Sequence, residues 1–99
     1  MFAFAIWDSA EKTIFCARDR LGIKPFFFSL IGREFWFASE IKGLLAAGVS
    51  PSPDNQVIAD YLKWGVYDHS ERTFFRDVRQ LKPGHTLSSH NGTIVERKY

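Results

Sequence analysis

Few side chains in this sequence of 99 residues could carry covalent chemistry. Cys16 is the only thiol and therefore the only strong candidate nucleophile. A nucleophile needs a neighbouring base and donors that hold the developing oxyanion. Cys16 instead falls in the middle of an apolar, strand-like run, in phase with Ile14. That pattern indicates a small buried hydrophobic residue rather than a reactive thiol.

Metal and phosphate sites are not predicted either. The three histidines, His69, His85 and His90, fall in predicted loops or turns far from Cys16, and no ligand spacing is present. Residues 20–24 contain one glycine, and the proline that follows removes a backbone donor. This segment is therefore interpreted as a structural loop rather than a phosphate-binding one. The sequence predicts no catalytic, cofactor-binding or metal-binding residue.

Binding to nucleic acid or membrane is also not expected. Trp7, Trp36 and Trp64 could stack on bases only beside a basic groove, and the aromatic residues mix with aliphatic ones as in a core. The formal net charge is +2, with lysine and arginine scattered along the chain. No apolar run reaches the length of a membrane-spanning helix. The single cysteine fits a reducing, cytoplasmic setting.

Four strands are predicted in the first part of the chain. Residues 2–7 form a nearly continuous apolar run, typical of a strand buried on both faces. Residues 13–18, 26–31 and 34–38 follow at short spacing, separated by turn residues. We expect these four strands to form an antiparallel meander, with residues 19–25 as a loop.

Two helices are predicted next. The first is capped by Ser39, carries Ile41, Leu44 and Leu45 at helical spacing, and stops at Gly48.

The second helix covers residues 55–64, after a cap at Asp54 and before Gly65. Residues 66–72 are expected to be exposed and flexible, and residues 73–75 to anchor the chain to the core. A turn at residues 81–85 leads to a hairpin formed by residues 86–88 and 93–97, because Asn-Gly is a strong hairpin signal. The overall prediction is an α+β fold with an antiparallel sheet.

Several blocks, in this order, resemble one family over essentially the whole chain. They are similar to the later part of the glutaminase domain of glutamine-hydrolysing asparagine synthetases, which are class II glutamine amidotransferases. The blocks are residues 1–8, 17–26, 37–42, 61–65, 73–78, 81–85 and 97–99.

The resemblance implies that residues 1–99 are a partial amidotransferase domain with the N-terminal-nucleophile (αββα) fold. The N-terminal catalytic part and the C-terminal synthetase domain are expected to lie outside it. The parent enzyme transfers ammonia from glutamine to aspartate activated by ATP, with ATP and magnesium bound in the synthetase domain. The family's nucleophile is a first-residue cysteine. Phe2 follows Met1 here, so the chain is expected to be inactive alone.

Three further expectations concern particular parts of the chain. The Arg18 and Asp19 side chains would pin their loop by hydrogen bonds to backbone groups, or alternatively form an exposed salt bridge. Residues 73–85 would pack against the synthetase domain, and the aromatic surplus would face a second sheet that is missing. Two alternative functions stay open: a non-catalytic module that donates strands to a partner chain, and another class II amidotransferase.

Overall fold

The elements follow the predicted order in the computed structural model, which describes residues 2–22, 24–64 and 72–99. Strands β2 and β4 and helix α2 have the expected bounds, β1 is displaced by one residue, and β3 begins one residue later than predicted. The elements are β1 (Ala3–Asp8), β2 (Thr13–Arg18), β3 (Phe27–Ile31), β4 (Glu34–Ala38), α1 (Ile41–Ala46), α2 (Asn55–Trp64), β5 (Arg79–Gln80), β6 (His85–His90) and β7 (Thr93–Lys98).

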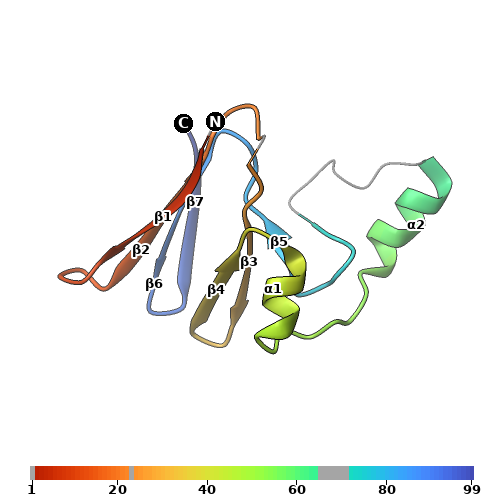
Figure 1. Cartoon of the computed structure of the whole chain (residues 1–99), viewed down its shortest axis with the longest axis horizontal. Coiled ribbons are helices and arrows are strands. Elements are labelled where there is room, and N and C mark those ends of the chain that lie inside the picture. Colours follow the sequence, from red (N-terminus) through yellow and green to blue (C-terminus); the bar gives the residue numbers. More distant parts are fainter. Residues whose placement is uncertain (1, 23, 65–71) are drawn as a thin grey trace.

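The described strands form two antiparallel sheets rather than one meander (Figure 1). One sheet has the order β1-β2-β6-β7 and the other the order β4-β3-β5. The predicted meander is wrong at the step from β2 to β3, which lie in different sheets. The place beside β2 is taken by β6, so that Cys16 stands opposite Leu87.

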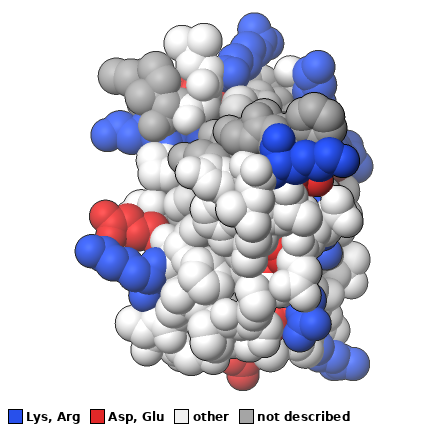
Figure 2. All heavy atoms as spheres, turned by 90° about the vertical axis from the view of Figure 1, so that its right-hand side faces the viewer, with Lys and Arg blue, Asp and Glu red and all other residues white. Residues whose placement is uncertain are grey.

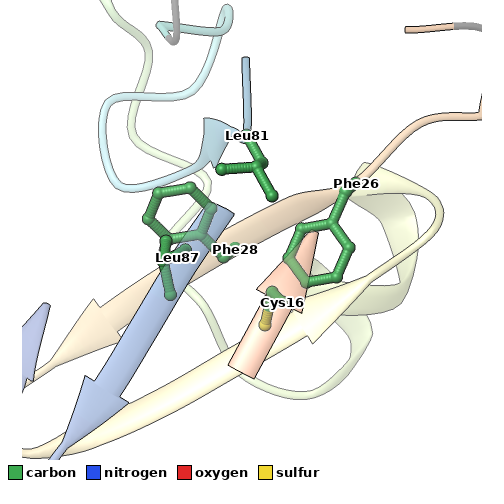
Figure 3. Packing of buried hydrophobic residues seen from close by; sticks show 5 residues of the cluster. All are labelled: Cys16, Phe26, Phe28, Leu81 and Leu87. Carbon is green, nitrogen blue, oxygen red and sulfur yellow. The ribbon is translucent and has the colours of Figure 1, made fainter. Parts of the chain in front are cut away.

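The main core lies between the two sheets. Leu87 and Cys16 come from the first sheet and Phe28 from the second, and Figure 3 shows these side chains gathered together. Phe26 and Leu81, which flank β3 and β5, complete the buried cluster. Each of these side chains loses nearly all its contact with water. This burial of apolar surface is the main contribution that holds the two sheets together.

A second cluster lies between the other face of the second sheet and α1. Its buried members are Leu44, Val49 and Val78, and Phe75 packs against them. Thr73 is buried as well. The prediction that residues 73–75 anchor the chain to the core is therefore confirmed.

Strand β1 lies at the edge of its sheet, and one of its faces is uncovered. Ala3 and Ala5 pack against the core, whereas Phe4 is 39% exposed and Ile6 is 56% exposed. The prediction of a strand buried on both faces is wrong, because no described segment covers the outer face. The chain also supplies two sheets itself, so the expectation of a missing second sheet fails. The surplus rings lie on the outside instead, where Phe4 contacts Phe15.

The two helices begin differently. At α1, Glu40 rather than Ser39 holds the cap position, in an extended conformation and without a side-chain capping bond. The prediction that Ser39 caps α1 is wrong, because the backbone is still extended at Glu40, one residue later. At α2, the predicted cap is confirmed, since Asp54 Oδ1 accepts the backbone N–H groups of Gln56 and Val57.

The predicted ends of the helices have different outcomes. Gly48, with φ +113°, follows the end of α1 as predicted. The predictions for Gly65 and for residues 66–71 lie outside the described residues. Arg72, at the edge of the described part, is exposed as expected.

The tail hairpin is confirmed, with longer strands than predicted. Asn91 and Gly92 both adopt positive φ between β6 and β7, at +49° and +86°. The two-residue strand β5 is not predicted by the sequence, because two residues carry no periodicity. In the part of the chain that the structure describes, no helix is long and apolar enough to cross a membrane.

Candidate functional site: the Arg18–Asp19 loop

Two buried charged residues lie at the end of strand β2 and directly after it. Arg18 and Asp19 are each 6% exposed, and Cys16, two positions before Arg18, is fully buried. Burying charged groups is unfavourable unless hydrogen bonds replace the lost water. The exposed salt bridge considered from the sequence is therefore excluded, and the contacts of these two side chains define the site.

The Arg18 guanidinium binds both the loop and the second sheet. Its Nε donates to the carbonyl oxygen of Lys24 at 2.9 Å, and its Nη2 donates to that of Gly22 at 2.7 Å. Its Nη1 donates to the Leu81 carbonyl at 2.6 Å and to Gln80 Oε1 at 3.3 Å. A planar, always-charged group with several fixed donors suits this role, which a lysine could not fill.

The Asp19 side chain closes the same loop and holds the start of β1. Its Oδ1 accepts the backbone N–H of Gly22 at 2.7 Å, and its Oδ2 accepts that of Phe2 at 3.1 Å. The Asp19 N–H in turn donates to the Phe2 carbonyl at 2.9 Å. The hypothesis that Arg18 and Asp19 pin this loop through backbone groups is confirmed.

Two more residues complete the site. The backbone N–H of Gly84 donates to the carbonyl oxygen of Asp19 at 2.8 Å, and the Tyr99 N–H donates to the Gly84 carbonyl. The Tyr99 hydroxyl donates to the Arg18 carbonyl at 2.7 Å, and the Arg20 guanidinium lies 5.5 Å from the centre of the Tyr99 ring. The loop thus joins the start of β1, the turn before β6 and the end of β7 at the end of the sheet where the two termini lie close together (Figure 1).

Sequence reasoning missed Gln80 and Tyr99 as members of this site. Gln80 lies 62 residues from Arg18, and Tyr99 lies 81 residues from it. No sequence pattern near Gln80 or Tyr99 predicts its contact with Arg18, because both contacts depend on which strands pair. Gly84 had a weak signal in the Pro-Gly turn predicted at residues 81–85.

Arg18 and Asp19 form a structural clamp: their side chains hold backbone groups of neighbouring segments together through hydrogen bonds. The Gly22 N–H is already bound by Asp19 Oδ1 and is therefore engaged within the loop itself. Burial raises the pKa of the Cys16 thiol to about 12, so the thiolate needed for attack does not form near neutral pH. No cluster of three metal-ligating side chains occurs among the described residues. His69 lies outside them, whereas Nδ1 of His85 contacts the Pro83 carbonyl and Nδ1 of His90 contacts the Lys12 carbonyl.

The two tryptophans whose side chains the structure describes lie in different surroundings. Trp36 packs against the second core cluster, whereas Trp7, at an edge strand, is 59% exposed. The side chain of Trp64 lies outside the described part. On the face that carries α1 and α2, lysines and arginines lie around the rim with acidic groups among them, and no continuous basic stripe is visible (Figure 2).

A second charge pair lies at the start of α2. Arg72 Nη2 donates to Asp54 Oδ1 at 2.6 Å, and Arg72 Nε donates to Asp54 Oδ2 at 3.0 Å. Burial alone would raise the pKa of Asp54. This effect is outweighed by the hydrogen bonds that Asp54 accepts from Arg72 and from the Val57 N–H, and by the positive charge of Arg72. The pKa of Asp54 therefore lies below its ordinary value. The pair fixes the helix start and reaches no nucleophile.

The segment of residues 73–85, expected at a domain interface, has both buried and exposed members. Phe75 packs against the second core cluster, so a charge placed there would destabilise the domain itself. Arg76 and Asp77 are exposed and are better probes of an interface. The interface stays a prediction, and its test belongs at the exposed positions.

The sequence is similar to a described family and to several known proteins. Over residues 1–99 the sequence matches the family described as the glutamine amidotransferase domain. It is 36% identical over 99 residues to the glutamine-hydrolyzing asparagine synthetase 3 of Bacillus subtilis (strain 168), covering 98% of this chain and 16% of that protein. It is 40% identical over 103 residues to asparagine synthetase 2 of the same organism, covering 99% of this chain and 14% of that protein.

A relative with a different name is equally similar. The sequence is 35% identical over 97 residues to the amidase chyE of Penicillium rubens, covering 98% of this chain and 14% of that protein. The chain therefore spans between about one seventh and one sixth of the length of these relatives.

Proposed function

The chain belongs to the glutamine amidotransferase family, and from that premise we propose that it forms part of the glutaminase domain of a glutamine-hydrolysing asparagine synthetase. In such an enzyme, ammonia released from glutamine is transferred to aspartate that has been activated by ATP. The similarity to two bacterial asparagine synthetases supports this assignment. The two stacked antiparallel sheets are compatible with the N-terminal-nucleophile fold that we propose for the complete domain.

Within that enzyme, the 99 residues act as a scaffold and not as the source of the nucleophile. The observation that carries this proposal is the state of Cys16, which is fully buried in the core and has a pKa raised to about 12. A thiol in that environment cannot attack the amide of glutamine. The nucleophilic cysteine therefore comes from another part of the enzyme, and the chain alone is inactive.

The remaining substrates and cofactors bind elsewhere. ATP, magnesium and aspartate are assigned to the synthetase domain of the parent enzyme, and we place that enzyme in the cytoplasm. The contribution of this chain is the clamp formed by Arg18 and Asp19, which fixes the relative positions of two hairpins and a loop. That geometry would support the glutaminase centre without touching the reacting atoms.

A chimeric enzyme tests this proposal. The matching segment of asparagine synthetase 3 from Bacillus subtilis is replaced by these 99 residues, and asparagine formation is measured with glutamine and then with ammonia as nitrogen donor. We expect both activities to be kept. The same chimera carrying Arg18→Ala should lose the glutamine-dependent activity first and keep the ammonia-dependent one. A chimera that uses ammonia but never glutamine contradicts the assignment, and glutamate release by the isolated chain contradicts the scaffold role.

Two other functions have specific support. The similarity to an amidase favours a class II amidotransferase with a different acceptor. Assaying the whole parent enzyme with aspartate as acceptor separates the two functions, because the acceptor is bound by the synthetase domain and not by these 99 residues. The edge position of β1 favours a module that pairs its strands with a partner chain. That module would co-purify with a separately expressed N-terminal segment of the domain and would restore its glutaminase activity.

A further inference from the structure

Two charged side chains point into the space between the sheets. Glu96 stands opposite Leu87 in the β6-β7 pair, and Leu87 is fully buried in the main core. Arg79 stands opposite Phe28 in the β3-β5 pair, and Phe28 packs in the same core (Figure 3). Directly paired residues project from the same face of a sheet. Glu96 and Arg79 therefore enter the inter-sheet space from opposite sides, where side chains are normally apolar.

These side chains line a cavity of about 440 Å³. Phe28 and Ile94 contribute apolar walls, and Arg76 and Asp77 contribute one further charge of each sign. Among the residues that the structure describes, none of the four charged side chains takes part in an ion pair or a side-chain hydrogen bond. The volume lies within the range of about 300–1,000 Å³ that is usual for sites of small molecules.

We propose that this cavity binds a free aliphatic α-amino acid in its zwitterionic form. The α-carboxylate pairs with the Arg79 guanidinium and the α-ammonium with the Glu96 carboxylate, while the aliphatic side chain lies against Phe28 and Ile94. Two positive and two negative groups make the lining neutral overall, which favours a neutral ligand with separated charges over a simple anion or cation. This site does not rest on glutamine hydrolysis and involves none of the clamp residues.

A titration followed by NMR tests the proposal on the 99-residue chain. L-leucine is added while the backbone amide signals of Phe28 and Glu96 are recorded, and 4-methylpentanoate and 3-methylbutylamine serve as ligands that each lack one charge. We expect saturable shifts with L-leucine, with a Kd on the order of 1 mM for so small a ligand. Each single-charge ligand should bind at least about tenfold more weakly. Equal binding of either one, or no saturable shift with L-leucine, overturns the proposal.

Substitutions locate the site. Arg79→Gln and Glu96→Gln should each weaken L-leucine binding at least about tenfold. Arg97→Gln is the matched control, because Arg97 stands opposite Thr86 on the outer face of the same strand as Glu96. All three residues are exposed, so the variants should keep the dispersed amide spectrum of the unaltered chain. Unchanged binding in both Arg79→Gln and Glu96→Gln would place the ligand elsewhere and refute the assignment.

Discussion

Replacing Arg18 by alanine tests the clamp most directly. Among the hydrogen bonds that the change removes, one ends on the buried Gln80 side chain and another on the carbonyl of the buried Leu81. A buried acceptor left without a donor costs about 1–3 kcal/mol, whereas the other two carbonyls, those of Gly22 and Lys24, can bind water. We therefore expect the free energy of unfolding to fall by about 2–4 kcal/mol.

The assay is urea unfolding of the 99-residue chain followed by tryptophan fluorescence, together with thermal melting. A loss of this size should lower the Tm by at least about 8 °C, because a domain of this length shifts by about 4–8 °C per kcal/mol. Arg18→Lys should recover part of the loss, since a single ammonium group can reach only some of the four acceptors.

Arg20→Ala is the matched control for this experiment. Arg20 is exposed, and its described contact is the Tyr99 ring 5.5 Å away, so its removal should cost no more than about 1 kcal/mol. If Arg18→Ala and Arg20→Ala lower the stability equally, the hydrogen bonds of Arg18 do not stabilise the fold and the reasoning fails.

Three further changes probe other parts of the molecule. The pKa of Asp54 is lower in the folded state than in the unfolded one, so its pairing with Arg72 contributes full stability above about pH 4. That contribution disappears as the pH falls through the folded-state pKa, and Asp54→Asn should flatten this part of an acid-unfolding curve. Cys16 should react with a maleimide at pH 8 only at the rate at which the chain opens, because its thiol is buried with a pKa of about 12. Gly22→Ala should destabilise the fold by about 1–3 kcal/mol, since φ is +64° and a Cβ would lie 2.4 Å from the Pro83 ring.

Each of these changes has its own control. Asp60→Asn leaves the acid-unfolding curve unchanged if Asp54 is the group responsible. Fast labelling of Cys16 in urea shows that the thiol is intact. Gly32→Ala has a similar φ of +62° but open space around the added Cβ, so it isolates the backbone strain. If Gly32→Ala is as harmful as Gly22→Ala, contact with the proline ring contributes nothing.

The sequence by itself determined the local elements of this protein. Alternating and periodic apolar residues placed β2, β4 and α2, the Asp54 carboxylate placed the start of α2, and Asn91-Gly92 placed the tail turn. These features depend on interactions within a few residues, so local patterns report them reliably. The burial of Cys16 was also predictable, because its phase with apolar neighbours put it on the inner face of a strand.

Only the tertiary structure decided how these elements assemble. Strand β2 pairs with β6, about 70 residues away, and leaves β3 to a second sheet, because strand pairing is settled by the total burial of both faces and not by nearness in sequence. The same choice brings Arg18 to Gln80, Leu81 and Tyr99, and sets Arg79 opposite Glu96 across the inter-sheet space. No local pattern contains these contacts, since each joins segments that become neighbours only when the two sheets pack.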